Sequence, residues 1–115
     1  MRDTPQHAEK ALAIVEHWLP RVAPRDEYLE LIAILKNPAR WKDAHELFNV
    51  IRVNITLRNE HQDMNSLDYH FIGIAENAAK TAYNCSGESA RFDDSTFDRL
   101  LRCEKDFVER IEKEG

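Results

Sequence analysis

The sequence predicts an all-α fold, a compact bundle of four long helices plus one short helix. Apolar residues recur in several segments with the period of about 3.6 residues that marks one face of a helix. Thr-Pro and Asn-Pro pairs precede two of these segments, as is typical of helix starts, because proline suits the first helical position. A chain of 115 residues is long enough for one core, so we expect residues 1–115 to form a single helical domain.

Two helices are expected in the N-terminal part of the chain. The first begins with Thr4 as its N-cap and ends at Pro20, and the second, a short one, covers about residues 26–36. The pair Asn37-Pro38 ends the second helix, because a residue that precedes proline avoids helical backbone angles. The apolar faces comprise Ala8, Ala11, Leu12, Val15, Trp18 and Leu19 in the first helix and Tyr28, Leu31, Ile32 and Leu35 in the second.

A helix over about residues 38–62 is expected at the centre of the bundle, with Asn37 as its N-cap and Pro38 as its first residue. Within residues 47–57 Arg52 is the only charged residue, although 32% of the whole chain is charged. A segment this poor in charge is expected to be buried on most sides. Its apolar residues, which cover more than half of the circumference, are Trp41, Ala44, Leu47, Phe48, Val50, Ile51, Val53, Ile55 and Leu57.

A β-strand over residues 50–58 is the alternative for this segment, and it would make the fold α+β. Apolar and polar residues alternate there, and several are β-branched, both of which are typical of a strand. The flanking residues contain no Gly or Pro to mark a boundary, and no other segment offers a clean partner strand. These two observations favour the helix.

The last two helices are expected over about residues 66–85 and from Ser95 onwards. Alanines on the first of them allow a neighbouring helix to approach closely. The loop between the two helices, residues 86–94, holds Phe92, which is a candidate anchor for a protein partner. The apolar faces comprise Leu67, Phe71, Ile74, Ala75, Ala78, Ala79 and Ala82 in the first and Phe97, Leu100, Leu101, Phe107, Val108 and Ile111 in the second.

A narrow polar strip, which we name the polar seam, runs along the helix expected at residues 38–62. It consists of His45, Asn49, Arg52, Thr56 and Asn59. One possibility is that these side chains form hydrogen bonds with one another and with nearby backbone groups. The other is that they line a groove that binds a polar or anionic ligand or the carboxylate of a partner.

Glu104 interrupts the apolar face of the last helix, where an unpaired carboxylate would be costly to bury. We therefore expect the last helix to pack across the polar seam, with Glu104 bonded to Arg52 or His45.

The stretch Arg40-Trp41-Lys42-Asp43-Ala44-His45 resembles the short motif of HEPN-type helical ribonucleases, in which an arginine precedes a histidine by several residues. The resemblance implies that His45 acts as general acid or base and that Arg40 contacts the phosphate. Trp41 departs from the motif, which usually has a polar residue at that position. The resemblance covers these residues alone and provides an alternative function.

Composition and charge exclude several classes of function. The formal net charge of −5 argues against binding to duplex DNA and fits a soluble protein that meets a basic partner surface. The start of the chain has charges inside its apolar pattern, unlike a signal peptide, and no uncharged run is long enough to span a membrane. Cys85 and Cys103 lack zinc-site spacing, and the histidines lack the paired carboxylates of bundle metal sites. We expect two free thiols and no metal or cofactor.

These observations predict a small cytoplasmic interaction protein, a regulator or inhibitor that acts by binding a protein partner. Missing catalytic motifs favour a binding protein over an enzyme without excluding an enzyme. The alternative is an RNA-cleaving domain using Arg40 and His45, or a domain that binds a small polar ligand along the polar seam. A homodimer remains open. The candidate binding residues are His45, Asn49, Arg52, Thr56, Asn59, Glu104 and Phe92.

Overall fold

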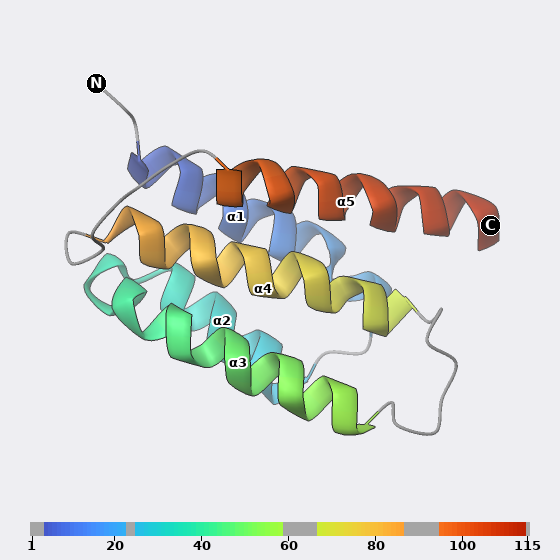
Figure 1. The fold of residues 1–115 in the computed structure, drawn as a ribbon, viewed down its shortest axis with the longest axis horizontal. Coiled ribbons are helices and arrows are strands. Elements are labelled where there is room, and N and C mark those ends of the chain that lie inside the picture. The colour runs from blue at the N-terminus through green and yellow to red at the C-terminus, as the bar shows by residue number, and fades with distance from the viewer. Residues whose placement is uncertain (1–3, 23–24, 59–66, 87–94, 115) are drawn as a thin grey trace.

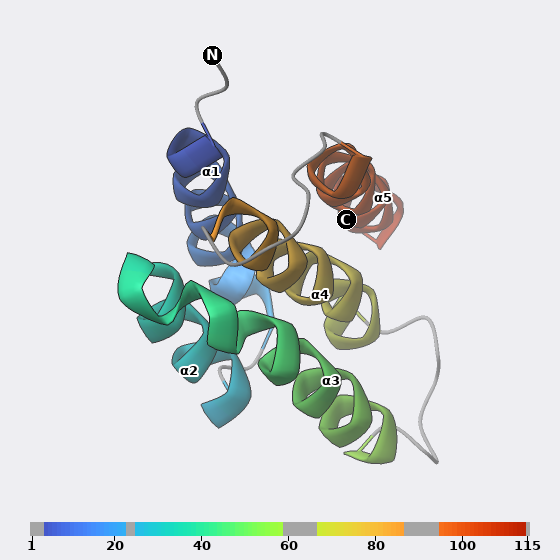
Figure 2. The same cartoon turned by 60° about the vertical axis from the view of Figure 1, so that its left-hand side comes forward.

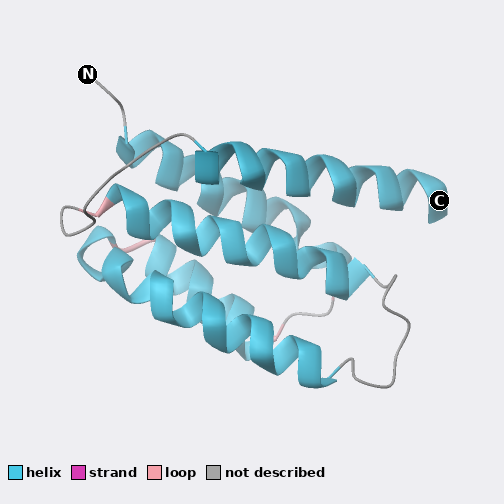
Figure 3. Cartoon of the chain, in the orientation of Figure 1, coloured by secondary structure: helices cyan, strands magenta, loops and turns pink. Residues whose placement is uncertain are grey.

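The computed structural model describes residues 4–22, 25–58, 67–86 and 95–114 (Figure 1). In these ranges every regular element is helical, which confirms the all-α bundle (Figure 3). Residues 50–58 belong to a helix, so the α+β alternative is wrong. The elements are α1 (Thr4–Trp18), η1 (Leu19–Arg21), α2 (Asp26–Leu35), η2 (Pro38–Arg40), α3 (Trp41–Arg58), α4 (Leu67–Cys85) and α5 (Ser95–Glu114), where η denotes a 3₁₀ helix.

Helix α4 lies at the centre of the bundle. It packs against α1, α2, α3 and α5, and it lies between α3 and α5 (Figures 1 and 2). Close packing on several sides requires small side chains, and the alanines of α4 supply them. Four alanines are fully buried, namely Ala75, Ala78, Ala79 and Ala82.

Helix α3 lies on the outside of the bundle, so its expected central position is wrong. Its inner face is buried through residues such as Ala44 and Ile51. Its outer face exposes Val50, Val53 and Leu57, whose side chains are 47%, 45% and 63% exposed. The lack of charge in this segment reflects an apolar stripe on the surface and uncharged polar residues beside it. A segment poor in charge is therefore not always a buried one.

The junction between α2 and α3 follows the expected capping pattern. The Asn37 side chain accepts a hydrogen bond from the Ala39 backbone N–H at 3.1 Å and caps η2, which leads directly into α3. The indole Nε1–H of Trp41 donates to the backbone carbonyl of Leu35 at 3.2 Å. This bond holds the end of α2 against the start of α3.

Helix α5 packs mainly on α4 and to a smaller extent on α1. Its buried face is built on Phe97, Leu100 and Phe107. Helices α3 and α5 make no extensive contact with each other. Among the described helices, none has both the length and the hydropathy needed to cross a membrane.

Candidate functional site

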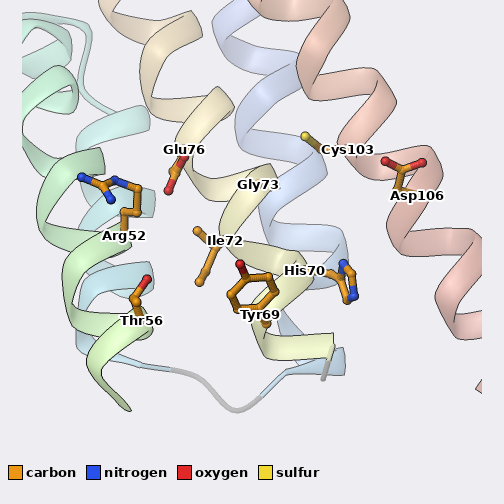
Figure 4. Close-up of a pocket in the computed structure, with 9 residues that line it drawn as sticks. All are labelled: Arg52, Thr56, Tyr69, His70, Ile72, Gly73, Glu76, Cys103 and Asp106. Carbon is orange, nitrogen blue, oxygen red and sulfur yellow. The ribbon is translucent and has the colours of Figure 1, made fainter. Parts of the chain in front are cut away.

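A groove of about 510 Å³ opens over α4, between α3 and α5 (Figure 4). This volume lies in the range of ligand-binding clefts, about 300–1,000 Å³. The groove is partly open to solvent. Its lining residues are Arg52 and Thr56 from α3, Tyr69, His70, Ile72, Gly73 and Glu76 from α4, and Cys103 and Asp106 from α5.

Helical spacing explains why these residues share one groove. Arg52 and Thr56 are four residues apart on α3 and therefore lie on the same face. On α4, Tyr69, Ile72 and Glu76 are separated by three and four residues and form the floor in the same way. The groove itself arises because α3 and α5 pack on α4 without packing on each other.

The polar seam lies along the boundary between α3 and α4. At one end, the ring of His45 packs on the ring of Tyr83, with centroids 4.6 Å apart. One turn further along α3, the Lys80 ammonium lies 4.8 Å from the centroid of the Phe48 ring. The opposite end of the polar seam, at Arg52 and Thr56, opens into the groove. The structure thus divides the polar seam into a part that is exposed, with His45 against an aromatic ring, and a part that lines a groove.

Arg52 on the α3 wall and Glu76 on the floor bring opposite charges to the groove (Figure 4). No hydrogen bond or ion pair joins either side chain to another residue in the described ranges. Burial raises the pKa of the half-buried Glu76 carboxyl, and the nearby charges of Arg52 and Lys80 partly offset that effect. Glu76 is therefore a half-buried acid that lines the groove, with the cations Arg52 and Lys80 close by but not bonded to it.

The wall formed by α5 is held against α4 by a cluster around Cys103. The Asn77 side-chain amide donates to the Gly73 carbonyl at 2.8 Å and to Cys103 Sγ at 3.4 Å. Burial raises the pKa of the Cys103 thiol, and the carboxylates of Asp106 and Glu76 raise it further, against the bond from Asn77. A thiol that stays protonated is a packing group and a poor nucleophile.

Glu104 does not contact the polar seam, so its expected bond to Arg52 or His45 is wrong. Its carboxylate accepts a hydrogen bond from the Trp18 indole at 2.6 Å. Helix α5 lies on the far side of α4 from α3 (Figure 2). Arg52 therefore remains available to the groove.

The two residues of the ribonuclease-like stretch make separate contacts. Arg40 Nε lies 3.4 Å from Asp43 Oδ2, and both side chains are exposed. His45 contacts the rings of Phe48 and Tyr83. Neither Arg40 nor His45 lines the groove.

The remaining candidate residues are placed as follows. Asn49 is exposed on α3 and does not line the groove. Asn59 and Phe92 lie outside the described residues. The groove residues His70, Gly73 and Glu76 of α4 were not identified from the sequence, because helical periodicity within α4 does not show that this face lies beside the polar seam of α3. Asp106 was missed altogether, because nothing local distinguishes it from the other charges on α5.

No group of three or more His, Cys, Asp or Glu side chains within the described ranges is arranged to hold a metal ion. Comparison of the chain with protein-family models, with curated proteins and with solved structures finds no match.

Proposed function

We propose that this chain is a small interaction protein that binds a segment of a protein partner in the groove between α3 and α5. The observation that carries the proposal is the pair of opposite charges, Arg52 and Glu76, that face the groove without bonding each other. Charged groups in such a position gain energy when a partner supplies the complementary charges.

The exposed apolar surface of α3 favours a protein partner over a small molecule. Val53 and Leu57 are exposed on the outer face of the helix that also carries the groove residues Arg52 and Thr56. Protein interfaces combine an apolar area with charged and polar groups in this way. Small ligands, in contrast, are usually enclosed on most sides.

The partner is proposed to be a cytoplasmic protein. Cys85 and Cys103 are free thiols, which persist in a reducing compartment such as the cytoplasm. The chain carries a formal charge of −5, which gives duplex DNA no electrostatic reason to bind.

Site-specific photo-crosslinking tests the proposal. A benzophenone amino acid replaces Thr56 in the groove, and in a control protein it replaces Ala13, which is exposed on α1. In lysate of the source cells, we expect a discrete protein adduct from position 56 that is absent from position 13. The adduct should disappear when Arg52→Glu is added to the crosslinking protein. Equal adducts from both positions, or none from position 56, would reject the groove as the binding site.

A second candidate function is the binding of a small carboxylate. It is favoured by Arg52 and Thr56, which place a guanidinium and a hydroxyl one helical turn apart in the groove. A small ligand of this kind would raise the melting temperature further at each higher concentration, as the logarithm of concentration above its Kd, and Arg52→Gln would abolish the rise. Citrate is a suitable probe, with sodium chloride at equal ionic strength as its control.

A further inference from the structure

We infer that Arg52 binds a carboxylate group in the groove and that Glu76 takes up a proton when this carboxylate binds. This inference rests on the function proposed above, and it adds the chemical class of the ligand and the effect of pH on its binding. It follows from the register of α3 against α4 and from the charges that this register brings together beside the groove.

Helices α3 and α4 pack antiparallel, and two contacts define their register (Figure 1). The ring of His45 packs on the ring of Tyr83, with centroids 4.6 Å apart. The Lys80 ammonium lies 4.8 Å from the centroid of the Phe48 ring. Phe48 is three residues after His45, and Lys80 is three residues before Tyr83. Both contacts therefore have the same antiparallel register.

One turn further along, this register places Arg52 opposite Glu76. Both residues line the groove, and Figure 4 shows them side by side on the α3 side of α4. Burial raises the pKa of the Glu76 carboxyl, and the charges of Arg52 and Lys80 oppose that effect, which confirms that both cations lie close to it. A second turn places Thr56 opposite Ile72, and these two residues line the groove as well.

The charge on this side of the groove favours an anion. Two cations, Arg52 and Lys80, lie close to the single acid Glu76, although the chain as a whole carries a charge of −5. The Lys80 ammonium lies over the Phe48 ring, whereas the Arg52 guanidinium makes no hydrogen bond or ion pair within the part of the chain that the structure describes. A guanidinium binds a carboxylate through two parallel N–H···O bonds, and one excess positive charge suits a group with one negative charge.

An ionised Glu76 would repel a carboxylate bound at Arg52. When two carboxylates share a site, the pKa of one of them rises and it takes up a proton. Glu76 is half-buried, and burial already favours its protonated form, so Glu76 is the group that gains the proton. Its neutral carboxyl can then donate an O–H hydrogen bond to the bound carboxylate. By linkage, the proton and the carboxylate strengthen the binding of each other by the same factor.

The other titratable residues that line the groove are Tyr69, His70, Cys103 and Asp106. Figure 4 shows His70, Cys103 and Asp106 on the α5 side of α4, away from Arg52. Burial and the Asp106 carboxylate raise the pKa of the Cys103 thiol, with a smaller contribution from Glu76, so this thiol stays neutral. Histidine is the residue type among these four that ordinarily titrates between about pH 5 and pH 8. A test of Glu76 must therefore include a variant of His70.

Titration with three probes of similar shape tests the inference. Benzoate is the anion, benzamide is its neutral control, and benzylammonium is the cation. The readout is the amide spectrum of the ¹⁵N-labelled protein, followed at Arg52, Ile72 and Gly73. We expect benzoate, which is ionised at both pH values, to bind about fivefold more tightly at pH 5.5 than at pH 8, which is the lower end of typical coupling between two sites. The other two probes should not bind.

Protein variants identify the groups responsible. Glu76→Gln resembles the protonated acid, so at pH 8 it should bind benzoate about as tightly as the parent protein does at pH 5.5, with little dependence on pH. Arg52→Gln should abolish binding at both pH values. Glu30→Gln, at an exposed site on α2, makes the same change in net charge as Glu76→Gln and should keep the pH dependence of the parent protein. His70→Gln should keep it as well.

The outcomes separate this inference from the function on which it rests. A pH dependence that persists in Glu76→Gln, or one that disappears in His70→Gln, would overturn the inference. Preference for benzylammonium would overturn it in favour of a basic ligand. If the protein partner supplies the carboxylate, adding Glu76→Gln should strengthen the photo-crosslinked adduct at position 56. No adduct, with benzoate binding as expected, would reject the protein partner and assign the site to a free carboxylate. Circular dichroism of each variant checks that the helices are intact.

Discussion

The indole of Trp18 donates a hydrogen bond to the Glu104 carboxylate at 2.6 Å and so joins α1 to α5. The same indole packs edge-on against Phe107, with ring centroids 5.4 Å apart. The hydrogen bond between Trp18 and Glu104 explains why a carboxylate can lie within the apolar face of α5. A partly buried acid needs a hydrogen-bond donor, and the indole N–H supplies one. Since α1 and α5 share few other contacts, the bond should contribute to holding α5 in place.

Removing either partner of this hydrogen bond should destabilise the protein. We expect Trp18→Phe and Glu104→Ala each to lower the free energy of unfolding by about 1–2 kcal/mol, and the double variant to lose less than the sum. Glu104→Gln keeps an acceptor and should lose less than Glu104→Ala. Urea unfolding provides the measurement, with Glu112→Ala, at an exposed site on α5, as control. Strictly additive losses would show that the two side chains do not interact in solution.

The close approach of α4 and α5 at Gly73 gives a second prediction. A Cβ added at Gly73 would lie 3.1 Å from Cys103 Sγ, which is too close unless the sulfur moves. Alanine gains about 1 kcal/mol over glycine within a helix. In a Cys103→Ala background, we expect Gly73→Ala to raise the free energy of unfolding by about this amount. In the parent protein, the same substitution should raise it much less or lower it. Thermal unfolding of the four proteins measures the difference. The same effect in both backgrounds would contradict this contact.

The raised pKa of Glu76 predicts a pH-dependent effect on stability. Burial favours the protonated carboxyl in the folded state, so Glu76 contributes fully to the free energy of unfolding when the pH is below the pKa that this carboxyl has in the unfolded chain. That contribution is lost as the pH rises through the higher pKa of the folded state. Glu76→Gln should therefore raise the free energy of unfolding at pH 7, by less than about 1 kcal/mol because the group is half exposed, and raise the melting temperature slightly with it. The difference should vanish in acid. A variant less stable than the parent at pH 7 would show that attraction to Arg52 and Lys80 dominates.

The thiol of Cys85 should react slowly with alkylating reagents. Burial raises its pKa from 9.0 to about 11, against a hydrogen bond from the Ala8 backbone. In a Cys103→Ser variant, which leaves Cys85 as the only thiol, the rate of reaction with iodoacetamide should still rise with pH above 9. At pH 8 it should be about a hundredfold slower than in the unfolded chain, since the thiolate fraction falls tenfold per unit. A plateau near pH 9 would contradict the prediction.

The helices themselves were predictable from the sequence because their signals are local. The apolar residues of α4 and α5 recur with the helical period, and the pair Asn37-Pro38 predicts the helix boundary before α3. The same periodicity places Arg52 and Thr56 on one polar face of α3, and the structure keeps them together in the groove. Each of these features depends on residues within a few turns of one another, so no knowledge of the neighbouring helices is needed.

The arrangement of the helices was decided only by tertiary packing. Charge content alone favoured α3 as the central helix, but the small side chains of α4 allow four neighbours to approach and place α4 there. Trp18 and Glu104 are far apart in sequence, and no local pattern pairs an indole with that acid. The groove likewise combines Arg52, Glu76 and Asp106 from three helices. Periodicity defines which residues share a face, but the volumes and shapes of all the faces together determine which faces meet and which stay open.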